Sequence, residues 1–287
     1  MTTRRQMLKQ FGLISAGTFL LKDSFAFDVK NKKVGIQLYT VRDQIFKDPK
    51  GVLKKIAALG YGEVENFGYA NGKFFGMSAQ EYKSVLTELK LEAPSGHYMY
   101  TSIQNGWDQA VEDAKAIGQK YMVLAYLMPN ERKTIADYKK IAADLNAAGA
   151  KCKKAGIQLC YHNHDFEFET LEGQTPYDIL VNETNKDLVK FEVDLYWASR
   201  AGQDPVGLFK KMQGRIALWH VKDMAKTANK EFTEVGNGSI NFAEIFKNAK
   251  LSGMKHFFVE QDVCPSDPMD SIAKSIKYIK SNLVNLL

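Results

Sequence analysis

The sequence predicts a single (β/α)8 barrel, and three observations support this fold class. From residue 34 onward, short apolar runs of strand length alternate with longer amphipathic stretches, and eight such pairs follow one another. No linker rich in Pro or Ser divides these units. The chain has 287 residues, which suits one barrel because such domains typically contain about 250.

Composition is that of an ordinary soluble globular protein. Hydrophobic residues make up 45% of the chain and charged residues 25%, which is enough apolar material for a large core. The formal net charge is +6, and residues 1–26 contribute a net +3 of it, with Arg4, Arg5, Lys9 and Lys22 against Asp23. The rest of the chain holds no basic block, so we expect no nucleic-acid partner.

Residues 1–26 form an expected export signal. Arg4 and Arg5 open a basic segment that resembles the twin-arginine signal. The apolar run over residues 11–21 is about half the ~20 residues that a spanning helix needs, so no stable membrane anchor is expected. Small residues at Ser24 and Ala26 predict cleavage after Ala26 and a periplasmic barrel domain over residues 27–287. An ordinary secretory signal is the alternative.

The cysteine residues predict no structural cross-link. The three cysteines, Cys152, Cys160 and Cys264, are odd in number and widely spaced. This pattern fits neither a disulfide framework nor a zinc finger. Cys160 lies in an apolar run, where it is expected to be a small core residue.

Eight apolar runs are the expected barrel strands. The first is followed by Tyr39-Thr-Val-Arg-Asp43 and not by a Gly-rich phosphate loop. An open doubly wound sheet would normally carry such a loop there, so the closed barrel is favoured over it. The expected strands cover residues 34–41, 62–67, 92–98, 121–127, 157–162, 189–196, 216–222 and 256–261.

The stretches between the strands have the spacing of amphipathic helices. Ile141, Leu145 and Ala148, for example, fall on one helical face. Glycines such as Gly60 and Gly156 follow helices directly, where the left-handed conformation closes a helix. The expected helices cover residues 49–59, 78–89, 107–117, 135–155, 176–183, 205–212, 242–249 and 270–284.

Polar and metal-capable side chains gather at the ends of the expected strands. The active site of a parallel barrel forms at these ends. Four of the five histidines stand there, and the fifth, His256, opens the eighth strand. The strand-end residues are Gln37, Tyr39, Arg42, Glu63, Glu65, His97, His162, His164, Glu167, Asp194, Trp197, His220, Lys222, Glu260 and Asp262.

Four of these residues form the predicted metal site. His162, Asp194, His220 and Glu260 come from four successive strands, so they can converge on one side of the barrel mouth. Imidazole and carboxylate together suit Mn, Zn, Co or Fe(II) better than Ca or Mg, which prefer oxygen shells. Taken singly, each residue would be a cap, an ion-pair partner or a rim residue. Their joint position predicts a divalent metal ion.

Six short segments resemble the xylose isomerase-like TIM barrels. This superfamily includes sugar isomerases and 3-epimerases, inosose dehydratase and endonuclease IV. The segments follow one another in the order of the family and span nearly the whole chain after residue 26. They cover residues 35–43, 155–164, 194–197, 220–223, 235–238 and 259–262.

The resemblance implies a site that departs from the 3-epimerase branch. That branch would place Glu, Asp, His and Glu on strands five to eight, and Asp194, His220 and Glu260 match the last three. His162 stands where the first Glu is expected, which removes one of two catalytic carboxylates. Trp197 also replaces a polar residue of the epimerases. The His-containing fifth strand resembles the inosose dehydratase side, where the chemistry is elimination, and Trp197 likewise points away from the epimerases. Endonuclease IV would need more His ligands than this chain carries.

The predicted chemistry is proton abstraction next to a metal-polarised carbonyl. Candidate acid–base residues are Glu260, His164 and Lys222. The sequence leaves open whether His162 or His164 is the ligand from the fifth strand. The expected substrate contacts are Arg42, Glu65, His97, Glu167, Tyr196 and Trp197.

Proton abstraction next to the carbonyl gives an enediolate. Three outcomes are open to it: isomerisation, epimerisation, or β-elimination by a dehydratase or lyase. An exported protein favours a neutral keto sugar or glycoside, because phosphorylated sugars are scarce outside the cytoplasm. A non-catalytic carbohydrate-binding barrel is the competing class. The expected partner is a small carbohydrate, and a homo-oligomer is compatible with the sequence. Trp197 could instead pack at the rim, and Lys222 could form an ion pair with Asp223.

Overall fold

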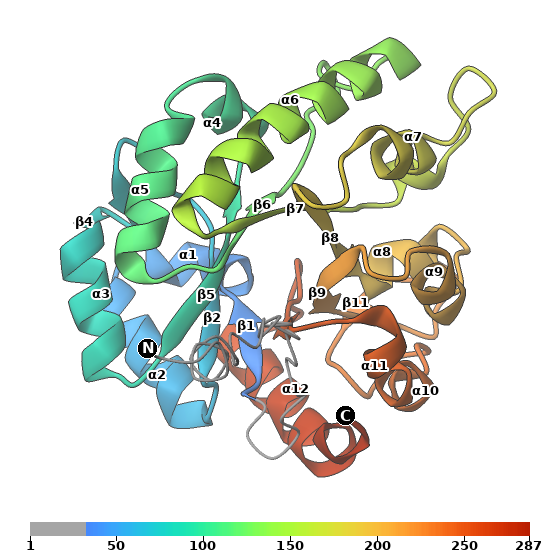
Figure 1. The fold of residues 1–287 in the computed structure, drawn as a ribbon. Coiled ribbons are helices and arrows are strands. Elements are labelled where there is room, and N and C mark those ends of the chain that lie inside the picture. The colour runs from blue at the N-terminus through green and yellow to red at the C-terminus, as the bar shows by residue number, and fades with distance from the viewer. Residues whose placement is uncertain (1–32) are drawn as a thin grey trace, which may run out of the picture.

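A computed structural model describes residues 33–287 as a closed barrel of eight parallel strands with helices around it (Figure 1). Each strand pairs with the barrel strands before and after it in the chain, and the last pairs with the first. The predicted (β/α)8 fold is therefore confirmed. The expected signal segment, residues 1–26, lies outside the described residues.

All eight expected strands are present. They alternate inward and outward side chains, so that on the seventh strand Leu218 and His220 face the barrel interior while Trp219 packs on Phe209 outside it. The barrel strands are β1 (Gly35–Gln37), β2 (Glu63–Asn66), β5 (Glu92–Tyr98), β6 (Tyr121–Leu124), β7 (Gln158–His162), β8 (Val189–Asp194), β9 (Ile216–Val221) and β12 (His256–Val259).

Six strands end one to four residues earlier than the sequence predicts, and after two of them, β1 and β8, a side chain caps the turn. The Gln37 side chain accepts a hydrogen bond from the Tyr39 backbone, and residues after it form the 3-10 helix η2 (Leu38–Val41). Asp194 likewise accepts from the backbone N–H of Trp197 at 2.9 Å and starts helix α8 (Leu195–Arg200). Both caps lie at the mouth of the barrel.

The outer helices follow the predicted ranges closely. Helix α6 (Ile135–Ala155) begins with a capping box between Thr134 and Asp137 and ends at Gly156, whose φ is 78°. The range 242–249 divides at Asn248 into two helices. The remaining helices are α1 (Arg42–Ile45), α2 (Pro49–Leu59), α3 (Ala79–Glu88), α4 (Tyr100–Gln104), α5 (Trp107–Ile117), α7 (Pro176–Glu183), α9 (Pro205–Lys211), α10 (Phe242–Lys247), α11 (Ala249–Ser252) and α12 (Pro268–Asn282), with the 3-10 helices η3 (Phe166–Phe168) and η4 (Val284–Leu286).

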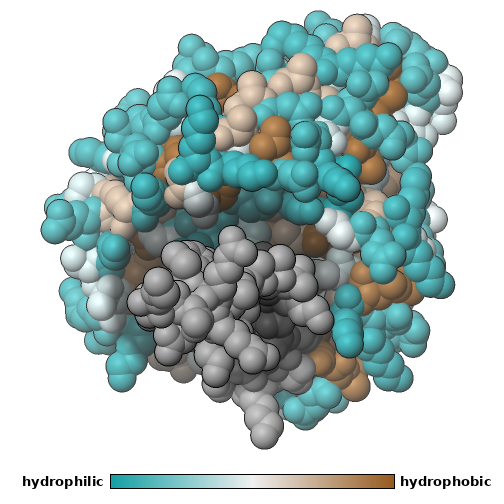
Figure 2. All heavy atoms as spheres, in the orientation of Figure 1, coloured by the Kyte–Doolittle hydropathy of each residue, from teal (hydrophilic) through white to brown (hydrophobic). Residues whose placement is uncertain are grey.

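Two short hairpins lie in the loops after β2 and β9. They are β3 (Lys73–Phe74) with β4 (Met77–Ser78), and β10 (Asp223–Met224) with β11 (Phe232–Thr233). On the face seen in Figure 2, hydrophilic residues predominate and hydrophobic residues form small separate patches. Within residues 33–287, no helix has the length and apolar character to cross a bilayer.

The barrel interior changes from apolar to polar toward the carboxyl ends of the strands. A small apolar cluster of Val123, Cys160, Ala217, Leu218 and Phe258 is separate from the main core outside the strands. Leu218 precedes the inward-facing His220 by two residues, so it lies beneath it. Polar groups therefore occupy the upper part of the interior, next to the mouth.

Candidate active site

Four polar residues meet at the carboxyl ends of β7, β8, β9 and β12. We call His162, Asp194, His220 and Glu260 the upper cluster. All four are buried, and one potential ligand atom from each lies within 4.8 Å of the others. The His162 Nε2 and Asp194 Oδ2 atoms are 3.2 Å apart, and His220 Nδ1 lies 2.7 Å from Glu260 Oε2. The structure thus brings together the four ligands predicted from the sequence.

His162 has the orientation of a ligand. Its Nδ1 lies 3.2 Å from the carbonyl oxygen of Ala125, which fits donation of the Nδ1 proton to that oxygen. The Nε2 atom is then free to face Asp194, an arrangement that commonly orients metal-binding histidines. It is His162, and not His164, that belongs to the upper cluster.

Lys222 supplies positive charge to the upper cluster. Its Nζ atom lies 2.7 Å from Glu260, 2.9 Å from Asp262 and 3.0 Å from Asp194. Burial lowers the pKa of Lys222, but these three carboxylates outweigh burial and hold the pKa well above 10.5. Burial raises the pKa of Glu260, yet Lys222 and His220 together bring that pKa well below 4.5. This pair is therefore fully charged near neutral pH.

The alternative ion pair between Lys222 and Asp223 is not formed. The Asp223 carboxylate accepts hydrogen bonds from the backbone N–H groups of Gly236 and Gly238, each at 2.9 Å. A Cβ atom at Gly238 would lie 2.2 Å from Asp223 Oδ1, so this turn requires glycine. Asp223 and the Val235–Gly238 segment organise the loop after β9, whereas Lys222 serves the site.

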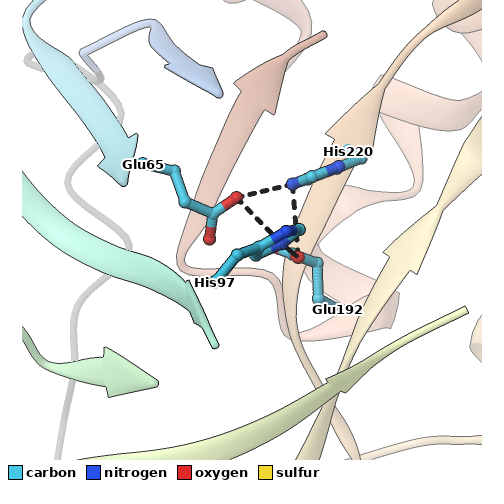
Figure 3. Close-up of side chains that lie close together, drawn as sticks. All are labelled: Glu65, His97, Glu192 and His220. Carbon is cyan, nitrogen blue, oxygen red and sulfur yellow. Dashed lines mark hydrogen bonds and ion pairs between the residues drawn. The ribbon is translucent and has the colours of Figure 1, made fainter. Parts of the chain in front are cut away.

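A second polar group lies deeper in the barrel. We call Glu65, His97, Glu192 and His220 the lower cluster, and Figure 3 shows their side chains pointing toward one another from β2, β5, β8 and β9. The Nε2 atom of His97 lies 2.7 Å from Glu192 Oε2 and 3.3 Å from Glu65 Oε2. The Nε2 atom of His220 lies 2.6 Å from Glu65 Oε2 and 3.2 Å from Glu192 Oε2.

Burial shifts the acid–base behaviour of the lower cluster. It raises the pKa of Glu192 to about 7 and also raises the pKa of Glu65, which Glu192 raises further. Burial lowers the pKa of His97 to about 4. Glu192 was not predicted from the sequence, because it lies inside an apolar strand and not at its end. The sequence nevertheless carried one indication of its role. Glu192 lies two residues before Asp194 on the same strand, so both side chains must face the barrel interior.

His164 stands beside the upper cluster in an aromatic surrounding. Its ring lies 4.9 Å from those of His162 and Tyr126 and 5.4 Å from those of Phe166 and Trp197, measured between centroids. Burial lowers the pKa of His164 to about 3, so the imidazole is neutral at pH 7. Its Nδ1 atom is buried and has no hydrogen-bond partner among the described residues.

Two predicted substrate contacts have structural positions instead. Glu167 is fully buried and accepts hydrogen bonds from the Tyr161 hydroxyl at 2.7 Å and from the His164 backbone at 2.8 Å. It therefore supports the His164 loop from behind. Tyr196 is 1% exposed, stacks on Phe232 and donates its hydroxyl proton to the Lys230 carbonyl. Tertiary partners therefore hold both side chains.

The other predicted contacts lie at different depths. Glu65 is fully buried in the lower cluster, so it is an internal residue and not a surface contact. His97 keeps 10% of its side chain exposed. Trp197 is partly exposed, with its ring 5.9 Å from Lys222 Nζ. Arg42 lies on the rim, where its guanidinium stands 4.4 Å from the centre of the Tyr39 ring.

A closed parallel barrel with imidazoles and carboxylates converging at its mouth defines a (β/α)8 protein with a candidate metal centre. Residues 53–282 match the model of the xylose isomerase-like TIM barrel family, and the chain belongs to that family. Inosose dehydratase from Clostridium perfringens is 28% identical over 163 residues, which cover 50% of this chain and 54% of that enzyme. The chain thus spans about half the length of this relative.

Solved structures share the architecture. A sugar phosphate isomerase/epimerase from Parabacteroides distasonis is 26% identical, with a TM-score of 0.79, over 92% of this chain and 98% of that one. The IolI protein, which was solved with a zinc atom, is 14% identical with a TM-score of 0.71, over 89% of this chain and 99% of that one. At that identity the likeness is one of fold. These comparisons confirm the superfamily predicted from the sequence.

Proposed function

We propose that this protein is a metal-dependent enzyme that removes the proton next to the carbonyl of a neutral keto sugar or keto-glycoside and then expels a β-substituent. The observation that carries the proposal is the pair of histidines at the carboxyl end of β7, His162 and His164. His162 joins the upper cluster where a two-Glu epimerase would carry the first of its two catalytic Glu residues. His164, next to it, offers a neutral imidazole with an unpartnered buried nitrogen.

The upper cluster fits a divalent ion in residue type, number and burial. Two imidazoles and two carboxylates offer four donor atoms within 4.8 Å of one another. An ion bound there would polarise the substrate carbonyl and stabilise the negative charge that develops as the proton leaves. Mn, Zn, Co and Fe(II) all suit this donor set.

His164 is the proposed base. The buried Nδ1 atom of His164 has no hydrogen-bond partner among the described residues, whereas the Glu260 carboxylate is engaged by Lys222 and His220. Lys222 would direct an N–H toward the enolate oxygen or toward the departing group. Trp197, at the mouth beside both residues, would lie against the sugar ring.

The direct test uses a 3-keto-glycoside with a chromogenic leaving group, assayed in D2O. We expect release of the leaving group, loss of release after chelation, and a decrease in kcat of about 10²-fold or more in His164→Gln. Deuterium in recovered, intact sugar without release would contradict elimination and support epimerisation. Sugar binding without exchange or release would indicate a non-catalytic barrel.

Isomerisation or epimerisation of a free ketose is the second candidate. It is supported by the likeness over nearly the full chain to the isomerase/epimerase from Parabacteroides distasonis. Both candidates share the abstraction step, and they differ only in the fate of the enediolate. A free ketose that lacks a β leaving group separates them, because only the second reaction converts it.

We also propose that the protein acts in the periplasm after twin-arginine export. Arg4 and Arg5 support this proposal. Substitution of both by Lys should leave a precursor in the cytoplasm, and N-terminal sequencing of the exported protein should begin at Phe27. Export of the double Lys variant at the normal level would indicate the ordinary secretory route.

A further inference from the structure

The geometry points to a second divalent-cation site in the lower cluster, held by Glu65, His97, Glu192 and His220. This inference rests on the proposed function in one respect: it takes the upper cluster as the first metal site. His220 lies between the two sites. Its Nδ1 faces Glu260, and its Nε2 faces Glu65 and Glu192.

The charge of the lower cluster calls for a cation. Glu65 and Glu192 are both fully buried, and within residues 33–287 neither forms an ion pair with a Lys or Arg. The nearby ammonium group of Lys222 pairs with Asp194, Glu260 and Asp262 instead. Buried carboxylates require a compensating charge; among the described residues, the ion-pair partners of these two are the imidazoles of His97 and His220, and a divalent cation held by all four residues would match the two carboxylates.

The donor atoms of the lower cluster are spaced closely enough to share one ion. The oxygen and nitrogen donors alternate, and neighbouring donors are 2.6 to 3.3 Å apart. Zinc at about 2.0–2.2 Å from four tetrahedral donors leaves them roughly 3.3–3.6 Å apart, so an outward movement of the closer donors by less than about 1 Å would suffice. The Oε1 atom of Glu192 is buried without a hydrogen-bond partner among the described residues, and this leaves it available as a further donor.

The surroundings hold the lower cluster in place. Glu65 accepts hydrogen bonds from the Ser95 hydroxyl and, at 2.8 Å, from the Gln37 amide. Such contacts behind a ligand fix its orientation and raise its affinity for the ion. His97 is the one member with an exposed edge, so it provides a route for the cation. The mixed imidazole and carboxylate donors favour Zn, Mn, Co or Fe(II).

The two sites lie at different depths. Glu192 precedes Asp194 by two residues on β8, so it lies about 6–7 Å deeper along the strand. Simultaneous filling of both sites requires each nitrogen of His220 to bind one ion, and the ring then loses its N–H proton to the solvent. Ions in the two clusters would therefore be joined through one imidazolate.

The test is metal stoichiometry of the full chain, stripped with a chelator, titrated with Co(II), dialysed and measured by elemental analysis. We expect two ions per chain in the wild type, one in Glu192→Gln and one in His162→Gln. Glu63→Gln, which alters an acid outside both clusters, should keep two. Near-UV circular dichroism establishes that each variant is folded, and His97→Gln gives an independent second variant of the lower cluster.

The outcomes separate the two proposals. One ion in the wild type, one in Glu192→Gln and none in His162→Gln would overturn the second site and leave the proposed function standing. One ion that is lost only in Glu192→Gln or His97→Gln would support the lower site and overturn the upper one. A wild type that binds no ion would overturn both. In the two-ion protein, the Co(II) absorption spectra of the two single variants should not sum to the wild-type spectrum, because each variant lacks the imidazolate shared between the two ions.

Discussion

The upper and lower clusters contain similar residues but balance their negative charge differently. In the upper cluster, Lys222 lies within 3.0 Å of three carboxylates, and the pKa of Glu260 falls well below its usual range. In the lower cluster no Lys or Arg of the described residues pairs with Glu192, and burial raises its pKa to about 7. Burial raises the pKa of both acids, and at Glu260 the charges of Lys222 and His220 reverse that effect.

His220 belongs to both clusters, so its removal should have the largest effect. His220→Ala is expected to lose bound metal and to reduce activity by more than about 100-fold, since loss of an orienting residue alone can cost that much. Metal analysis and turnover of a keto-glycoside measure the two effects. His256→Ala, outside both clusters, is the control. Full activity of His220→Ala without metal would contradict the site.

Removal of the buried Lys222 ammonium group should destabilise the upper cluster strongly. In chelated protein, Lys222→Met leaves Asp194, Glu260 and Asp262 without their partner, and loss of about 3–5 kcal/mol in the free energy of unfolding is expected. Urea denaturation measures it. Added Zn(II) should recover part of the loss, because it replaces the missing charge.

The matched control is an exposed ion pair. Lys50 pairs with Glu88 at 2.8 Å, and the two side chains are 58% and 60% exposed. Lys50→Met should therefore cost less than about 1 kcal/mol. Equal effects of the two substitutions would show that Lys222 is not the charge that balances the upper cluster.

Glu167 extends the comparison to an acid outside both clusters. Burial raises its pKa to about 7 in the folded protein, above the unfolded value of 4.5. The folded state therefore binds the proton more tightly, and its contribution to stability is present below pH 4.5 and is lost as the pH rises through 7. When the pH rises from 5 to 8, the free energy of unfolding of the chelated wild type should fall by up to about 3 kcal/mol more than that of Glu167→Gln.

The measurement is urea denaturation of both proteins at the two pH values. The difference between them is the relevant quantity, because other buried acids titrate in the same range. Glu169→Gln, an exposed neighbour, should follow the wild type. A pH dependence in Glu167→Gln identical to that of the wild type would contradict the assigned pKa of Glu167.

The sequence predicted the upper cluster because its members stand at strand ends, and strand ends follow from local patterns. All four predicted ligands meet, although they are separated by up to 98 positions along the chain, from His162 to Glu260. The lower cluster could not be predicted in the same way. Glu192 lies within an apolar strand, and its contact with Glu65 depends on which side chains reach the barrel axis at one depth.

The roles of single residues were harder to predict than their positions. Glu167 and Tyr196 follow strands as expected, yet both are buried, with Glu167 hydrogen-bonded to Tyr161 and Tyr196 stacked on Phe232. Lys222 was placed correctly, but its partners are Asp194, Glu260 and Asp262 and not the adjacent Asp223. In each case a tertiary contact decides the role of the residue, and the local spacing along the chain does not predict that contact.

The smallest expected effect uses two acids on one face of one strand. Glu192 and Asp194 are two residues apart on β8, and both are fully buried. In chelated protein, Glu192→Gln should raise the free energy of unfolding by about 1–2 kcal/mol, because it removes a buried carboxylate that lacks a Lys or Arg partner. Asp194→Asn should lower it, because Asp194 pairs with Lys222 and caps α8.

Glu192→Gln and Asp194→Asn should therefore change the free energy of unfolding in opposite directions. This result would demonstrate the proposed difference between the two clusters. Addition of Co(II) should make the wild type more stable than Glu192→Gln, since the wild type then gains a bound ion that Glu192→Gln cannot hold. Urea denaturation with and without the ion measures both states of each variant. If Glu192→Gln destabilises the chelated protein as much as Asp194→Asn does, protons already balance the lower cluster, and its charge provides no drive for cation binding.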